Sequence, residues 1–464
     1  MIKGPSLKVN LITLGCPKNV VDSEVLKGGL KLRGVEFVAD AAAAEAIIVN
    51  TCGFIESAKE ESIDTILQAV ALKKQGSCKQ VFVTGCLSER YTPELRKEIP
   101  EVDGFYGNRD LRQIVNGLAR QMRLKYELLG ESNAAGEREL ITPRHYAYLK
   151  ISEGCEHPCT FCAIPQIRGG FRSTPIPMLV QEARLLAEKG VKELILVAQD
   201  STQYGLDLNG RQQLPQLLRA LCEVEGIEWL RVMYAYPHHV TDEMIEIIAS
   251  QPKIVKYLDM PIQHITDRML KRMARRVNRG FTEELLARLH AKIPNLVLRT
   301  SLITGFPGET EEDFQSLYDF VCEGHFERLG VFTYSHEENT PAFNFSEQVE
   351  EEIKRERYDL LTEAQREIAA EWNRRHLGRE LRVLIDEYDE HEHAYRGRTE
   401  WDCPEIDHNV VIPSTNGRLA CGDFYQVQIT GSADFELTGH LKSQPNASLP
   451  QATAANGRYL KVLA

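Results

Sequence analysis

Three cysteines within eight positions constrain this chain of 464 residues more than any other feature. The stretch EGCEHPCTFC places Cys155, Cys159 and Cys162 at the spacing C-x3-C-x2-C, directly after the apolar run YAYLKIS. Strand-like and helical segments alternate from about residue 145 to residue 335, with six strand candidates. This alternation predicts a barrel or partial barrel of parallel strands, in which the loops after the strands carry the functional groups. We expect the three cysteines in the first of these loops.

The spacing of these cysteines favours an iron–sulfur cluster over zinc. Structural zinc takes four ligands, commonly from two C-x2-C pairs, and no fourth cysteine follows within fifty residues. His157 lies between the cysteines, where so short a loop would crowd a further ligand. Three thiolates can hold a 4Fe-4S cluster and leave its fourth iron open to a small molecule.

The motif C-x3-C-x2-C, with the aromatic Phe161 before its last cysteine, resembles the signature of the radical S-adenosylmethionine (SAM) superfamily. The resemblance implies that the open iron binds SAM and that the reduced cluster cleaves it to a 5′-deoxyadenosyl radical. The glycine-rich segment ITGFPGET, which contains Gly305, resembles the segment beside SAM in this superfamily, although GFPGE is equally typical of a turn. Gln199 follows another strand and is the second residue that we expect near SAM.

Three further cysteines each follow a strand in the first part of the chain. LITLGC, IIVNTC and VFVTGC end in Cys16, Cys52 and Cys86. The carboxyl ends of parallel strands meet at one edge of a sheet, so the three thiols should converge there. They are expected to hold a second 4Fe-4S cluster; the alternative is three buried cysteines that act as small apolar side chains.

The chain is predicted to be an α/β protein of three domains. A parallel α/β domain occupies residues 1–125, a partial (β/α)6 barrel residues 143–378, and a small antiparallel β-barrel residues 379–445. A polar linker is expected at residues 126–142 and a tail at residues 446–464.

This domain order resembles the methylthiotransferase family over nearly the whole chain, and the last domain resembles a TRAM domain. The resemblance implies two 4Fe-4S clusters, one of which carries or supplies sulfur. The resemblance further implies that one SAM provides the methyl group and that another provides the radical that takes a hydrogen atom from an unactivated C–H bond. It also implies an electron donor such as a flavodoxin-type protein.

Two features bear on the substrate. The segment LGCPKNVVDSE carries Pro-Lys after its cysteine, which resembles the branch that modifies the β-carbon of an aspartate in ribosomal protein S-twelve; the tRNA branch has Gln-Met there. Residues 380–440 contain thirteen acidic and four basic side chains, a balance that suits a basic protein better than a phosphate backbone. The alternatives are a tRNA adenosine methylthiotransferase and a non-enzymatic RNA- or ribosome-binding protein with structural zinc.

The remaining features favour a cytoplasmic protein without a membrane partner. The start MIKGPSLKVN lacks the apolar core of a signal peptide, and no apolar run approaches the length of a membrane span. The eleven cysteines, an odd number, argue against a fully paired disulfide framework. The net charge of −12 argues against non-specific coating of nucleic acid.

Overall fold

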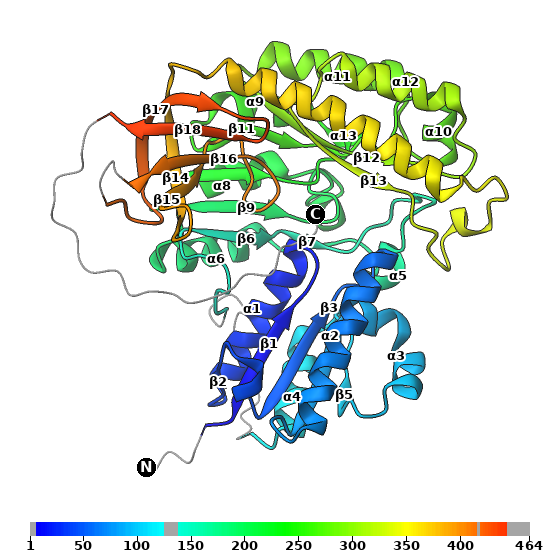
Figure 1. Ribbon diagram of the computed structural model, residues 1–464, viewed down its shortest axis with the longest axis vertical. Coiled ribbons are helices and arrows are strands. Elements are labelled where there is room, and N and C mark those ends of the chain that lie inside the picture. Colours follow the sequence, from blue (N-terminus) through cyan, green and yellow to red (C-terminus); the bar gives the residue numbers. More distant parts are fainter. Residues whose placement is uncertain (1–5, 125–137, 415–417, 443–464) are drawn as a thin grey trace.

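The computed structural model describes residues 6–124, 138–414 and 418–442. Figure 1 shows three bodies along the chain: a blue-to-cyan α/β domain, a green-to-yellow sheet with its helices, and an orange-to-red barrel. None of the helices in the described ranges is both long and apolar enough to cross a membrane. The predicted tail and most of the predicted linker lie outside the described residues, so the domain boundaries stay a prediction.

The first domain is built on a five-stranded parallel sheet in the order β2-β1-β3-β4-β5. Its central strand β3 is buried along its whole length, because helices cover both faces of such a sheet. The strands are β1 (Lys8–Thr13), β2 (Glu36–Phe37), β3 (Ala46–Thr51), β4 (Gln80–Gly85) and β5 (Gly104–Phe105), and the helices are α1 (Pro17–Lys31), η1 (Ala41–Ala43), α2 (Glu56–Lys74), α3 (Cys86–Glu98) and α4 (Leu111–Gln121).

The central domain contains six parallel strands that lie side by side in chain order. All six predicted strands are present, which confirms the partial (β/α)6 barrel. The strands are β6 (Tyr146–Lys150), β9 (Glu193–Val197), β10 (Trp229–Val232), β11 (Ile254–Asp259), β12 (Val297–Thr304) and β13 (Arg328–Thr333), with a short antiparallel pair β7 (Ser152–Glu153) and β8 (Arg172–Ser173) beside them.

Amphipathic helices pack one face of this sheet into the main apolar core. Thr310 caps the start of the helix α12, and its side chain forms a capping box with Asp313. The helices are α5 (Ile164–Arg168), α6 (Ile176–Glu188), α7 (Leu206–Asn209), α8 (Leu214–Cys222), η3 (Pro237–His239), α9 (Asp242–Ser250), α10 (Asp267–Arg272), α11 (Arg279–Lys292), α12 (Glu311–Cys322), η4 (Pro341–Asn344) and α13 (Glu351–Arg374).

The third domain is a closed five-stranded barrel in the order β14-β15-β16-β18-β17. The predicted small barrel is confirmed, and four of its strand pairs are antiparallel. The pair β16 and β18 is parallel, which the short strand pattern did not predict. The strands are β14 (Glu380–Asp389), β15 (Ala394–Arg398), β16 (Asn409–Pro413), β17 (Phe424–Ser432) and β18 (Glu436–Leu441).

The first and third domains cover opposite ends of the central sheet. The barrel pairs with residues at the amino ends of the strands: Arg398 with Glu193, and Asp402 with Arg328. The first domain pairs with the carboxyl end of β6, where Lys150 contacts Asp22 at 2.5 Å. Of these two domains, as far as the described residues show, it is the first that reaches the strand ends at which barrels of this kind place their chemistry.

Candidate active site

Cys16, Cys52 and Cys86 follow three neighbouring strands of the first sheet. Cys16 precedes α1, and Cys86 is the first residue of α3. The loops approach so closely that a side chain at Gly15 would lie 2.7 Å from the Cβ of Cys52. Gly15 also has a φ of +84°, so both its space and its backbone require glycine. The structure thus brings the three predicted cysteines to one edge of the sheet.

The surroundings of these thiols suit metal ligands better than free thiols. Burial raises the pKa of Cys52 to about 12, and the neighbouring Cys86 and Cys16 add to the effect. Burial also raises the pKa of Cys86. Thiols with raised pKa values, such as those of Cys52 and Cys86, stay protonated at neutral pH, whereas bound iron would hold them as thiolates. The donor set therefore fits an iron–sulfur cluster.

The second set, Cys155, Cys159 and Cys162, lies in the loop that follows β6 and β7. Gly154 has a φ of +81°, and a side chain there would lie 2.2 Å from the carbonyl oxygen of Gly170. Burial raises the pKa of Cys155 to about 11 and that of Cys162 to about 12. The guanidinium of Arg275 lies 3.7 Å from the Sγ of Cys159 and adds positive charge beside the thiols. This set fits a cluster for the same reason as the first.

His157 has a partner that the sequence did not predict. Its Nε2 lies 2.7 Å from the Oδ2 of Asp200, and the Nδ1 of His239 lies 3.0 Å from the same oxygen. The imidazole of His157 stacks on Tyr236 at 4.2 Å. The side chains of His157, Asp200 and His239 lie close enough to hold a metal ion. Each already has a hydrogen-bond partner among the other two, so we interpret these side chains as the anchor of the cysteine loop on the sheet.

Arg168, the last residue of α5, connects the two cysteine sets. Its Nη2 donates to the Sγ of Cys86 at 3.4 Å and to the Oδ1 of Asn19 at 2.5 Å. Its Nη1 donates to Asp22 at 2.7 Å and to Glu153 at 3.2 Å. Glu153 lies two residues before Cys155 in the chain. A single buried side chain therefore contacts one cysteine and the strand that leads to the other set.

An apolar contact brings the same two sets together. Cys86 packs with Ala163 and Ile167 in a small buried cluster. Ala163 is the residue after Cys162, so the loop of the second set packs directly on a cysteine of the first.

The two residues expected near SAM have different surroundings. The Nε2 of Gln199 donates to Glu153 at 3.0 Å, while its buried Oε1 has no hydrogen-bond partner in the described part of the chain. An unsatisfied acceptor beside the cysteine loop fits a donor such as an ammonium group of a ligand. Gly305 has a φ of +69°, and a side chain there would meet Lys354 at 2.2 Å. The glycine is therefore needed for packing against α13, whether or not SAM approaches it.

The other polar residues at the strand ends are engaged within the protein. Asp259 pairs with Arg299 at 2.9 Å, and His264 lies 3.2 Å from Glu309. These side chains support the strand ends.

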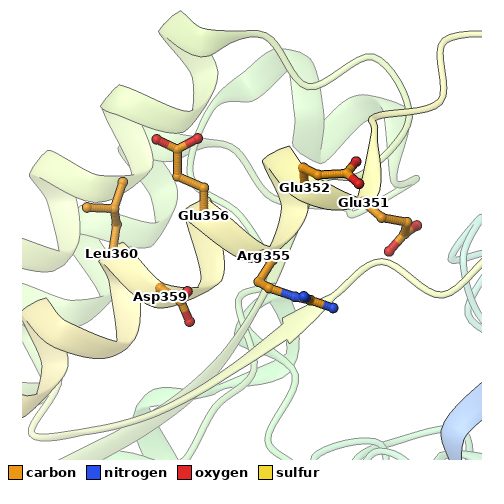
Figure 2. A pocket seen from close by; sticks show the side chains of 6 residues that line it. All are labelled: Glu351, Glu352, Arg355, Glu356, Asp359 and Leu360. Atoms are coloured by element: carbon orange, nitrogen blue, oxygen red, sulfur yellow. The ribbon is translucent and has the colours of Figure 1, made fainter.

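A surface hollow of about 430 Å³ lies along α13, far in the chain from any cysteine of the two sets. Figure 2 shows its lining, in which acidic side chains predominate and project from a single helix. It is lined by Glu351, Glu352, Arg355, Glu356, Asp359 and Leu360. A single exposed helix face of this composition does not enclose a ligand.

Sequence reasoning used Lys18 only as a marker of the substrate branch and did not identify the basic residues beside the cysteines as part of the site. Lys18 follows Cys16 by two positions, Arg168 follows Cys162 by six, and Arg275 is remote in sequence. The proximity of Lys18 and Arg168 to cysteine motifs was a signal that could have identified them. Nothing in the sequence points to Arg275.

Family models match most of the chain. Residues 8–107 match the uncharacterized protein family UPF0004, residues 149–321 match the radical SAM superfamily, and residues 377–441 match the TRAM domain. A radical SAM enzyme uses a 4Fe-4S cluster and SAM, and two clusters are typical of the methylthiotransferases.

Curated relatives resemble the chain over almost its full length. A protein of Christiangramia forsetii named ribosomal protein uS12 methylthiotransferase RimO is 48% identical over 93% of this chain and 94% of its own. Proteins with the same name from Anaeromyxobacter and Geobacter sulfurreducens are 47% and 46% identical. They cover 97% and 94% of this chain and 97% and 99% of their own.

A solved structure supports the fold. The radical SAM methyltransferase TsrM of Kitasatospora setae superposes with a TM-score of 0.52 at 14% identity, over 73% of this chain and 77% of its own. On the full-length similarity to the curated relatives, the chain belongs to the RimO family of methylthiotransferases within the radical SAM superfamily.

Proposed function

We propose that this enzyme attaches a methylthio group to the β-carbon of an aspartate in ribosomal protein uS12, the S-twelve protein of the predicted branch. Cys155, Cys159 and Cys162 hold the cluster that binds SAM, and Cys16, Cys52 and Cys86 hold the second cluster. The clusters and SAM, when bound, supply the one-electron chemistry and the sulfur that the side chains lack. The observation that carries the proposal is the contact of Cys86 with Ala163, next to Cys162.

The reaction needs this closeness for a physical reason. The carbon that loses a hydrogen atom is the carbon that gains sulfur, so both cofactors must reach one atom of the substrate. Effective catalysis requires the reacting groups to be held near contact distance. Two cysteine sets on separate domains meet this need only where the domains pack together, as they do around Arg168.

The protein substrate is favoured over tRNA. The curated relatives are named for uS12, at 46–48% identity over more than nine-tenths of the chain. An acidic surface suits a basic ribosomal protein, and the chain carries a net charge of −12. This substrate implies a cytoplasmic location, and a flavodoxin-type protein would suit the need for single electrons.

The acidic surface of the third domain is smaller than the charge count over residues 380–440 suggests. Asp386 pairs with Arg398, and Asp389 with Arg396, so neither is a free surface charge. Glu387 and Glu390 are exposed and remain available to a basic partner.

The test is a reaction without oxygen, in which reduced enzyme and SAM are supplied with unmodified uS12 and unmodified tRNA together. Mass spectrometry then locates any added methylthio group. We expect the group on an aspartate of uS12. A methylthio group found on tRNA alone would contradict the proposed substrate. If fully loaded enzyme modifies neither uS12 nor tRNA, the proposed activity is contradicted.

A further inference from the structure

Lys18 is a buried cation beside the first cysteine set. It lies in the first turn of α1 and is 8% exposed. Its ammonium nitrogen lies 3.5 Å from the centroid of the Tyr234 ring. A ring face stabilises a cation without neutralising its charge. Lys18 makes no ion pair with any carboxylate in the ranges that the structure describes.

The other basic residues near the cysteines are already engaged. Lys150 and Arg168 both pair with Asp22, at 2.5 and 2.7 Å. Arg275 donates to Cys159 and to the carbonyl oxygen of Pro261. The thiolates of the proposed first cluster lie nearby, but no carboxylate of the described residues pairs with Lys18. A buried charge that is incompletely paired is costly, so the position of Lys18 is suited to an anion that arrives with the substrate.

Tyr234 holds this ammonium at a defined place. The residue follows β10 and has a φ of +61°, a strained conformation for a side chain of this size. Its backbone N–H donates to Asp259 at 3.0 Å, and its carbonyl accepts from Ser201. Such strain is maintained only where the surroundings enforce it, and it is concentrated at functional sites.

The ammonium is close to Cys16 of the first cysteine set, whose thiol interacts with it electrostatically. Tyr234, whose ring it contacts, is two residues before Tyr236, and Tyr236 stacks on His157 of the second cysteine loop. In the proposed reaction, the β-carbon that receives sulfur is bonded directly to the carboxylate carbon of the aspartate. The carboxylate must therefore lie within this same space.

We infer that Lys18 binds the carboxylate of the target aspartate and selects aspartate over uncharged side chains. The inference rests on the proposed function. An asparagine at the target position has nearly the same shape, but it would give the ammonium no carboxylate partner. Selection then follows from the cost of leaving the buried cation without that partner.

The experiment measures the dissociation constants of uS12 and of uS12 with the target aspartate replaced by asparagine. Each is measured with cluster-loaded wild-type enzyme, Lys18→Met, Lys18→Arg and the control Lys31→Met, which alters an exposed lysine of the same helix. Wild-type enzyme and Lys31→Met should bind the aspartate form roughly tenfold to a hundredfold more tightly. Lys18→Met should bind both forms alike, and Lys18→Arg should regain part of the preference.

The opposite results are distinguishable. A preference for aspartate that persists in Lys18→Met overturns the inference. If that preference persists and the electron paramagnetic resonance signal of the first cluster shifts, the role of Lys18 is to neutralise the cluster. Equal weakening of both forms also overturns it. Wild-type enzyme that fails to modify uS12 overturns the proposed function, and the inference with it. Iron content and circular dichroism verify that each variant is loaded and folded.

Discussion

Arg168 is the residue on which the two halves of the site depend. Its guanidinium presents donors in a planar fork, which lets it contact Cys86, Asn19, Asp22 and Glu153 together. Lysine carries the same charge but cannot make this set of contacts. The residue therefore supplies both positive charge beside a cysteine and a geometric link between two domains.

We expect Arg168→Met to lower the reduction potential of the N-terminal cluster, because a nearby positive charge favours the added electron. The loss of Arg168 as a buried ion-pair partner of Asp22 should also lower the free energy of unfolding by about 3 kcal/mol. This is the lower end of the usual range, because Lys150 still neutralises Asp22. Arg168→Lys should keep the potential closer to that of the wild type. A redox titration followed by electron paramagnetic resonance checks this in enzyme without the second cysteine set. An unchanged potential in Arg168→Met would refute the role.

At the scale of elements, β14 shows why charge counting on the sequence overstated the acidic surface. The strand contains Asp386, whose carboxylate accepts from Arg398 and lies 2.7 Å from His145. The carboxylate thus joins the third domain to the start of β6. All three tryptophans lie near this junction: Trp229 stacks edge-on to Phe424, and Trp372 to Trp401.

The Asp386 pairing predicts a pH dependence of stability. Burial alone would raise the pKa of Asp386, but Arg398 and His145 outweigh it and hold the pKa below its usual range. A carboxyl group with a lowered folded-state pKa stabilises the protein above its unfolded pKa of about 3.9. That contribution is lost as the pH falls through the lowered pKa.

We therefore expect Asp386→Asn to reduce the free energy of unfolding by about 3–5 kcal/mol at pH 7. The difference from the wild type should shrink as the pH falls below about 4, where Asp386 becomes protonated in the unfolded chain, and should be lost below the lowered folded-state pKa. Tryptophan fluorescence during urea unfolding at several pH values measures it. The exposed neighbour Glu387 provides the control Glu387→Gln, which should change stability little. A difference that is constant with pH would contradict the assignment.

At the scale of the whole molecule, the two cysteine sets belong to separate domains and converge where these pack. Each set is formed by local strand-end geometry, so each cluster should assemble without the other. The catalytic reaction, in contrast, requires both domains together.

Protein prepared without oxygen should contain about eight irons and as many sulfides. Replacement of Cys16, Cys52 and Cys86 with alanine should leave about four irons, and SAM should still be cleaved slowly when a reductant is supplied. Replacement of Cys155, Cys159 and Cys162 with alanine should leave the four irons of the first cluster and abolish the cleavage of SAM. Iron analysis and detection of 5′-deoxyadenosine check both variants. If replacement of Cys16, Cys52 and Cys86 leaves the iron content unchanged, the assignment of a cluster to these residues is contradicted. Zinc in place of iron would contradict both cluster assignments.

The sequence by itself determined the strands that precede the cysteines and the positions of the cysteines. The apolar runs before Cys16, Cys52, Cys86 and Cys155 predicted strands, and β1, β3, β4 and β6 are those strands. Parallel strands end at a common edge, so local pattern alone placed each cysteine set. The two-residue edge strands β2 and β5 were missed, because so short a run has no periodicity.

Only the tertiary structure decided how the three domains meet. It placed the third domain at the amino ends of the central strands and the first at their carboxyl ends. It also brought Lys18 onto Tyr234 and Arg168 onto Cys86, across separations of more than eighty residues. Hydrophobic periodicity reports which face of an element is buried, but not which distant side chain it meets. The contacts that join the two cysteine sets therefore became visible only in the folded chain.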